Sequence, residues 1–301
     1  MPSKQLQDMV AWLYEEQAKA QGIPPIDEWR EGYEEFGRAF PAEPGVGPRP
    51  VDAGGVNAAW FAAPGADNDR VVMYFHGGGY LMGSLTTHLS ITSRLTGVTG
   101  ARVLALDYRL APEHRFPAPI DDIVASYRWL LDRGIAPGGI AFVGDSAGGG
   151  MCVAGLLALR QAGLPMPSCA VPISPWVDLV GAGAWREADP AIDPIVGPHE
   201  LDRFVREYLS DDQARDPLAS PLFGDLAGLP PLLIQVGTRE ILLSDATRLA
   251  ERARNAGVET TLEIEDGGFH VWHHAVPDLP EARAALERIG AFVGGQMGRR
   301  Q

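Results

Sequence analysis

The sequence is poor in cysteine, with only Cys152 and Cys169 among its 301 residues. They form no C-x-x-C pair and share no metal-ligand spacing with histidine, so we expect neither a disulfide framework nor a structural zinc ion. Cys152 falls in an apolar helical stretch and Cys169 lies just before a predicted strand. Buried free thiols are therefore the expectation for both residues.

The chain also lacks long hydrophobic segments and an excess of positive charge. No stretch approaches the length of a transmembrane helix, and residues 1–22 lack the long apolar region of a secretory signal. The expected location is the cytoplasm. The formal net charge of −14 argues against nucleic acid or an anionic membrane as a partner. The sequence leaves open whether the chain forms a homodimer.

Short apolar strands alternate with longer helices after residue 50. Two helices are predicted before this region, over 5–20 and 27–40, and residues 41–50 follow them with four prolines and two glycines. The alternation predicts an α/β domain whose mostly parallel sheet is covered by helices on both faces. The predicted strands are 55–64, 70–75, 102–108, 139–144, 169–175, 231–237 and 260–267, and the predicted helices are 87–100, 118–134, 147–163, 244–257 and 279–296.

An insertion over about 176–223 interrupts this alternation. It is rich in proline, aspartate and glycine, and only residues 198–210 have a helical pattern. Loops of this length inside a compact domain usually act as lids or binding elements. We therefore expect the insertion to lie close to the functional site.

The most informative motif is Gly144-Asp145-Ser146-Ala147-Gly148, a G-x-S-x-G pattern. An apolar strand precedes it and an apolar helix follows directly, which is the context that a nucleophile elbow requires. The turn would expose the hydroxyl of Ser146 at the carboxyl end of the sheet. A phosphate-binding loop would instead predict a lysine or further glycines before the helix, and neither is present. We interpret Ser146 as a nucleophile.

A serine nucleophile needs a histidine base and an acid that orients the base. On this kind of fold the chain order is serine, acid, histidine. Among the seven histidines, His270 lies just after the last predicted strand, in a glycine-containing loop. His273 and His274 follow where a solvated or packed turn is expected. His270 is therefore the predicted base.

Two carboxylates follow the predicted strand 231–237, namely Glu240 and Asp245. Asp245 has a local structural explanation, because it would lie in the first turn of the next helix beside Ser244 as an N-cap. Glu240 has no such local role and lies nearer the end of the strand. We favour Glu240 as the acid and keep Asp245 as the alternative.

Three successive glycines, Gly77, Gly78 and Gly79, follow the strand that ends near His76. A tight turn alone would not need three residues without side chains. Acyl transfer builds negative charge on a carbonyl oxygen, which needs preorganised N–H donors. The residue after the nucleophile, Ala147, would supply one donor, and the amides of Gly78 and Gly79 are predicted to supply the others.

With these residues assembled, the chain resembles the hormone-sensitive-lipase-like family of α/β-hydrolases, the bacterial esterases with an HGGG box. The shared motifs are HGGGYLMGS, DYRLAPEHRFPAPIDD, GDSAGG, SPWVDL and DGGFHVW, and they cover nearly the whole chain. The family's acid box has the form D-x-L, and this chain has Glu240 where the aspartate is usual. The resemblance implies an α/β-hydrolase fold, hydrolysis of small hydrophobic carboxylic esters or lactones, and no metal or organic cofactor.

The same resemblance implies how the chain is organised. Residues 1–45 would form an N-terminal helical cap segment and residues 46–301 the catalytic domain, with the insertion at about 176–223 completing the cap. Glu113 and His114 would be structural, in a loop that supports the glycine-rich segment. A ligand-binding receptor on the same fold is an alternative, but that class usually loses a triad member. An amidase or acyltransferase would share the triad, whereas a dehalogenase or epoxide hydrolase would need an aspartate at position 146.

Overall fold

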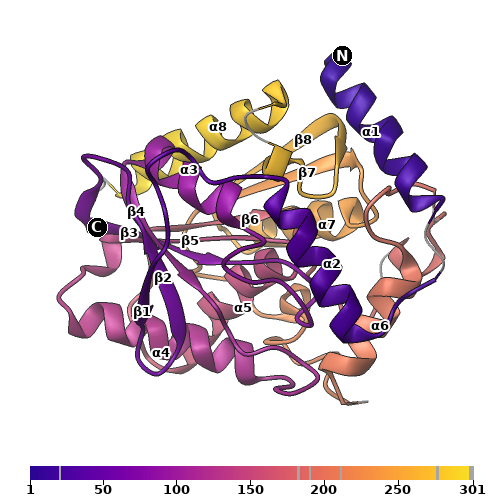
Figure 1. Cartoon of the computed structure of the whole chain (residues 1–301). Coiled ribbons are helices and arrows are strands. Elements are labelled where there is room, and N and C mark those ends of the chain that lie inside the picture. The colour runs from indigo at the N-terminus through magenta and orange to yellow at the C-terminus, as the bar shows by residue number, and fades with distance from the viewer. Residues whose placement is uncertain (20–21, 182–183, 190, 211, 276–277, 298–301) are drawn as a thin grey trace.

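A twisted sheet of eight strands forms the centre of the protein (Figure 1). The computed structural model describes residues 1–19, 22–181, 184–189, 191–210, 212–275 and 278–297. The strand order is β1-β2-β4-β3-β5-β6-β7-β8, and the strands from β4 to β8 in this order are parallel to one another. The strand bounds are β1 Arg49–Asp52, β2 Asn57–Phe61, β3 Asp67–Phe75, β4 Ala101–Leu106, β5 Ile140–Asp145, β6 Cys169–Ile173, β7 Leu232–Arg239 and β8 Thr260–Phe269.

The structure confirms the seven predicted strands and adds β1, which the sequence analysis missed. The prolines and glycines of residues 41–50 hid this strand. β1 pairs only with β2, antiparallel, at the edge of the sheet. An edge strand can contain Pro50 because one side of its backbone needs no hydrogen-bonded neighbour.

Helices cover both faces of the sheet because neighbouring strand residues point to opposite sides. Met73 and Phe75 belong to one hydrophobic core, with α4 (Ala118–Asp132), α5 (Ala147–Gln161) and α7 (Leu243–Asn255). Val72 and Tyr74 belong to the other core, with α3 (Leu89–Thr99) and α8 (Pro280–Met297). The mostly parallel sheet with helices on both faces is therefore confirmed.

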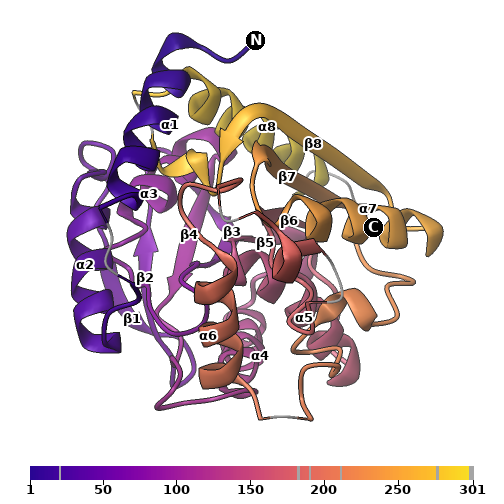
Figure 2. The ribbon, with the colours of Figure 1, turned by 90° about the vertical axis from the view of Figure 1, so that its right-hand side faces the viewer.

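Three further helices lie together on the side of the molecule that faces the viewer in Figure 2. They are α1 (Lys4–Gln17) and α2 (Ile26–Arg38) from the N-terminal segment and α6 (Pro198–Tyr208) from the insertion. Residue 20 of the predicted first helix lies outside the described residues. Among the described helices, none is long and apolar enough to cross a membrane. The domain boundary at residue 45 stays a prediction.

Candidate active site

Ser146 lies in a sharp turn between β5 and α5. Its φ of 55° and ψ of −118° place it in a conformation that side-chain-bearing residues rarely adopt. The turn is possible because glycines surround it. A Cβ atom at Gly144 would lie 2.4 Å from the carbonyl oxygen of Gly148, and one at Gly148 would lie 1.9 Å from that of Phe75. The strand–turn–helix context predicted for this motif is thus present.

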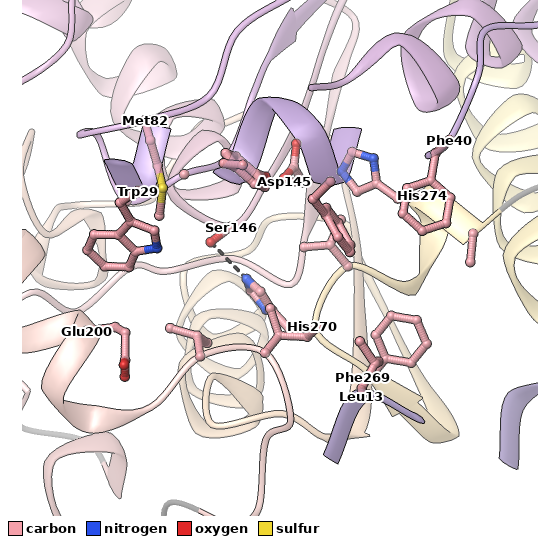
Figure 3. A pocket seen from close by; sticks show the side chains of 18 of the residues that line it. Leu13, Trp29, Phe40, Met82, Asp145, Ser146, Glu200, Phe269, His270 and His274 are labelled. Atoms are coloured by element: carbon pink, nitrogen blue, oxygen red, sulfur yellow. Dashed lines mark hydrogen bonds between the residues drawn. The ribbon is translucent and has the colours of Figure 1, made fainter. Parts of the chain in front are cut away.

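Ser146, His270 and Glu240 form a continuous chain of hydrogen bonds. The Oγ of Ser146 lies 2.9 Å from Nε2 of His270 (Figure 3). Nδ1 of His270 lies 3.0 Å from Oε2 of Glu240. The three residues come from the ends of β5, β8 and β7, which are parallel and end on the same side of the sheet. This chain can transfer a proton from the hydroxyl to the imidazole and stabilise the resulting imidazolium.

The carboxylate of Glu240 is fixed from its other side. Its Oε1 accepts hydrogen bonds from the hydroxyl of Ser174 at 2.8 Å and from the amide of Gly237 at 2.6 Å. The residue is 1% exposed. These bonds leave Oε2 directed at His270, so the tautomer with the proton on Nδ1 is favoured.

The electrostatic surroundings of His270 favour its protonated form. Burial lowers the pKa of His270, but the hydrogen bond and charge of Glu240 outweigh it, and the charges of Asp193 and Asp145 act in the same direction. The pKa of His270 is therefore raised above its ordinary value. A raised pKa suits a base that must hold a proton during the reaction.

Asp245 lies elsewhere and has a structural role. Its Oδ2 accepts hydrogen bonds from the amides of Val177 and Asp178, and its Oδ1 pairs with Arg248 at 2.9 Å. It therefore ties the start of the insertion to the first turn of α7. The predicted N-cap at Ser244 is wrong, because α7 begins at Leu243 after Leu242 and no side chain caps it.

The glycines after β3 face the same site. Gly78 has a φ of +110° and Gly79 a φ of +62°, and both residues line the pocket that contains Ser146. In the described part of the chain, the amides of Gly78, Gly79 and Ala147 donate to no other group. Three N–H groups beside the serine hydroxyl can hold a developing oxyanion.

Side chains at the glycine positions should therefore impair turnover. A Cβ at Gly78 would lie 2.1 Å from the carbonyl oxygen of Met82, and one at Gly79 would lie 2.4 Å from the ring of Phe204. We expect Gly78→Val and Gly79→Val to lower kcat by at least the roughly 10²–10³-fold ascribed to one lost oxyanion donor. Gly138→Val is the control, because a Cβ there meets nothing within 4 Å. Near-normal turnover of both site variants would mean that these glycines serve only the turn.

A buried polar network lies behind Ser146, and the sequence analysis missed it. Asp145 accepts hydrogen bonds from the hydroxyl of Tyr74 and the amide of Gly77, and its Oδ2 lies 3.3 Å from Nε2 of His88. His274 packs against His88, and it is buried together with His273, so of the two expected alternatives the turn there is packed and not solvated. The network holds the glycine-rich loop against the nucleophile turn.

Three residues of this network have side chains close enough together to be considered as ligands of a metal ion. Ligand atoms of His88, Asp145 and His274 lie within 4.8 Å of one another. Oδ1 of Asp145, however, already accepts from Tyr74 and Gly77, and its Oδ2 faces Nε2 of His88. The pKa of His274 is lowered to about 3, first by burial and then by the nearby His88, which keeps this imidazole neutral. Asp145 and His88 are thus hydrogen-bonded within the network, whereas Nε2 of His274 has no hydrogen-bond partner among the described residues.

A mostly apolar pocket of about 180 Å³ opens at Ser146. Figure 3 shows Trp29, Met82 and Glu200 on one side of the Ser146–His270 pair and Leu13, Phe40 and Phe269 on the other. The walls therefore come from both the N-terminal helices and the insertion, as well as from the sheet. The side chains that line the pocket include Met9, Trp12, Tyr33, Phe36, Ile195, Val196, Phe204 and Val271.

Arg30 joins α2 to the loops around the glycine-rich segment. Its guanidinium donates to the carbonyl oxygens of Leu81 and Ala111 and forms an ion pair with Glu113 at 2.8 Å. Glu113 thus contributes to the support of this region, as the resemblance implied for it. Through Arg30, the N-terminal segment therefore contacts the loops around the glycine-rich segment in addition to forming part of the pocket wall.

The comparisons with known proteins agree with this geometry. A family model for the alpha/beta hydrolase fold matches residues 72–274. An acetyl-hydrolase from Streptomyces hygroscopicus is 47% identical over 249 residues, which cover 83% of each chain. An esterase from Acinetobacter venetianus is 37% identical over 257 residues, covering 85% of this chain and 84% of its own.

The comparison of structures points to a narrower group. A crystal structure of an esterase from the bacterial hormone-sensitive lipase (HSL) family is 45% identical and has a TM-score of 0.94, covering 99% of this chain and all of its own. The motifs, the sheet topology and these relatives agree. The chain is a carboxylic ester hydrolase and belongs to the hormone-sensitive-lipase family of α/β-hydrolases.

Proposed function

We propose that the protein hydrolyses carboxylic esters through a covalent acyl-enzyme on Ser146. The observation that carries the proposal is the unbroken chain from Oγ of Ser146 through His270 to Glu240. The serine oxygen attacks the ester carbonyl carbon while Nε2 of His270 accepts its proton. Glu240 holds the imidazole in the required tautomer and stabilises its positive charge.

The remaining steps use the same residues. The amides of Gly78, Gly79 and Ala147 hold the oxyanion of the tetrahedral intermediate. Collapse of this intermediate breaks the bond to the alcohol oxygen, which leaves with the proton from His270. Water then attacks the acyl-enzyme, His270 accepts the proton of the water, and the carboxylic acid is released as Ser146 regains its hydrogen.

The pocket favours small to medium hydrophobic acyl groups. Its volume of about 180 Å³ lies below the roughly 300–1,000 Å³ of pockets for drug-sized ligands. Residues 1–45 and the insertion contribute its outer walls, so we propose that they form a cap that limits acyl length. The acetyl-hydrolase among the relatives supports a short acyl group.

A chain-length series of p-nitrophenyl esters tests this proposal. We expect kcat/KM to be highest among the short esters from acetate to about hexanoate and to fall toward laurate, because a long chain exceeds the pocket. The cap explanation also predicts that Phe40→Ala, which removes a ring from one end of the pocket, extends the range to longer chains. A preference for laurate, or a profile that Phe40→Ala leaves unchanged, would contradict the proposed role of the cap.

A further inference from the structure

Asp193 is a fully buried carboxylate in the insertion, and neither the motifs nor the resemblance drew attention to it. Its Oδ1 accepts hydrogen bonds from the amides of Ile195 at 2.8 Å and Val196 at 3.2 Å. Its Oδ2 accepts from the amide of Ile241 at 3.1 Å. The carboxylate therefore bridges two segments that are almost fifty residues apart in the chain.

Both segments belong to the site. Ile195 and Val196 line the pocket at Ser146, and Ile241 directly follows Glu240. The segment is also attached to α1, because the side chain of Gln17 donates to the carbonyl oxygen of Asp193 at 2.9 Å. Asp193 thus lies where the N-terminal helix, the insertion and the loop of Glu240 meet.

The charge of Asp193 is unusual for a site so deeply buried. Its exposed fraction is 0%, and no lysine or arginine of the described chain forms an ion pair with it. A buried charge without a countercharge is unfavourable unless something compensates it. Burial raises the pKa of Asp193 to about 6, whereas the nearby His270 and the amides of Ile195 and Ile241 favour its ionised form.

The imidazole of His270 is a group whose protonated form this charge favours. The charged and titratable groups that act on His270 are the carboxylates of Glu240, Asp193 and Asp145 and the imidazoles of its neighbours His273 and His274. Burial lowers the pKa of both neighbouring imidazoles to about 3, so they are neutral in the working range. The three carboxylates therefore determine how strongly the site favours the imidazolium.

We propose that Asp193 is a positioning residue of this esterase, which holds the Glu240 loop through the Ile241 amide, fixes the pocket wall at Ile195 and Val196, and stabilises the His270 imidazolium by its charge. The proposal rests on the proposed roles of Glu240 and His270. It makes the insertion part of the electrostatics of the reaction in addition to being a wall for the substrate. A merely structural Asx turn would account for the first two amides but not for the bond to Ile241.

The sign of the pH effect follows from the charge. A negative group near His270 favours the protonated imidazole, and its removal lowers the pKa of His270. The acid limb of the kcat/KM profile reports this ionisation in the free enzyme. Loss of the Asp193 charge should therefore shift the acid limb to lower pH, although kcat falls because the imidazolium of the transition state is less stabilised.

The test is the variant Asp193→Asn, assayed with p-nitrophenyl butyrate between about pH 5 and 9. We expect the acid limb to move down by up to about one pKa unit and kcat to fall by up to roughly 10-fold, because one pKa unit of lost interaction corresponds to a factor of ten. Asp193→Glu keeps the charge and should leave the acid limb near its wild-type position. The position of the limb does not depend on how much of the variant folds.

Asp216→Asn is the matched control. Asp216 makes the same kind of turn, with its Oδ1 accepting from the amide of Leu218 at 2.8 Å, but it does not line the pocket. An Asp193→Asn enzyme with a wild-type acid limb and wild-type kcat would overturn the proposal, as would a limb that moves equally in both variants. If Asp193→Asn is normal while Ser146→Ala is inactive, only the role of Asp193 fails. If Ser146→Ala remains active, the proposed function fails instead.

Discussion

Ser146→Ala is expected to lower kcat by about 10⁴–10⁶-fold, the loss seen when a triad nucleophile is removed. The hydroxyl is the group that contacts Nε2 of His270. The fold should survive, because the turn is fixed by backbone bonds that alanine retains, from the amide of Ser146 to Ile173 and from the amides of Gly150 and Trp176 to the carbonyl of Ser146. Turnover of p-nitrophenyl butyrate and the melting temperature measure the two effects separately.

A second serine serves as the control for this variant. Ser126 is fully buried in α4 and is not one of the residues that line the pocket. Ser126→Ala should leave kcat within a few-fold of wild type. If Ser146→Ala kept more than a few per cent of the wild-type rate, Ser146 would not be the nucleophile.

Glu240→Gln has the second largest expected effect, a drop in kcat on the order of 10²–10⁴-fold. The amide oxygen of the glutamine would stay with its donors, Ser174 and Gly237, because both groups present hydrogens to that position. The amide NH₂ would then face Nδ1 of His270 and favour the tautomer with the proton on Nε2. That tautomer cannot accept the proton of Ser146, so the histidine cannot act as a base.

Asp245→Asn is the matched comparison for this variant. Asp245 is as buried as Glu240, but its partners are Arg248 and two backbone amides of the insertion. We expect roughly 1.5–3 kcal/mol less stability, the usual value of a hydrogen bond to a charged group, and turnover within a few-fold at moderate temperature. If Asp245→Asn were the slow enzyme and Glu240→Gln merely less stable, the assignment of the acid would be reversed.

The strands of the sheet and the helices that cover it could be predicted because the sequence patterns that indicate them are local. Apolar strands, glycine-rich turns and helical periodicity can each be recognised within a short stretch of sequence. Ser146 and the glycine-rich loop lie in such stretches. The order of serine, acid and histidine along the chain then restricted the base to His270. Each of these predictions depends on sequence neighbours and on general rules for parallel sheets.

The residues that escaped prediction depend on contacts between distant segments. Asp193 looks like an ordinary aspartate before a proline, and only the fold brings it to Ile241. The network of Asp145, Tyr74 and His88 likewise joins three separate elements. The local interpretation placed Asp245 correctly in the first turn of α7 but missed its bonds to the amides of Val177 and Asp178, which only the fold brings to it.

Covalent labelling with a fluorophosphonate tests the central claim most directly, because this reagent forms a stable adduct with an activated serine in place of the acyl group. Intact-mass analysis should show a single adduct that appears as activity is lost, and peptide mapping should place it on Ser146. The Ser146→Ala variant should remain unlabelled, and Glu240→Gln should be labelled slowly at the same residue. An adduct on a different residue, or complete inactivation with Ser146 unmodified, would contradict the account.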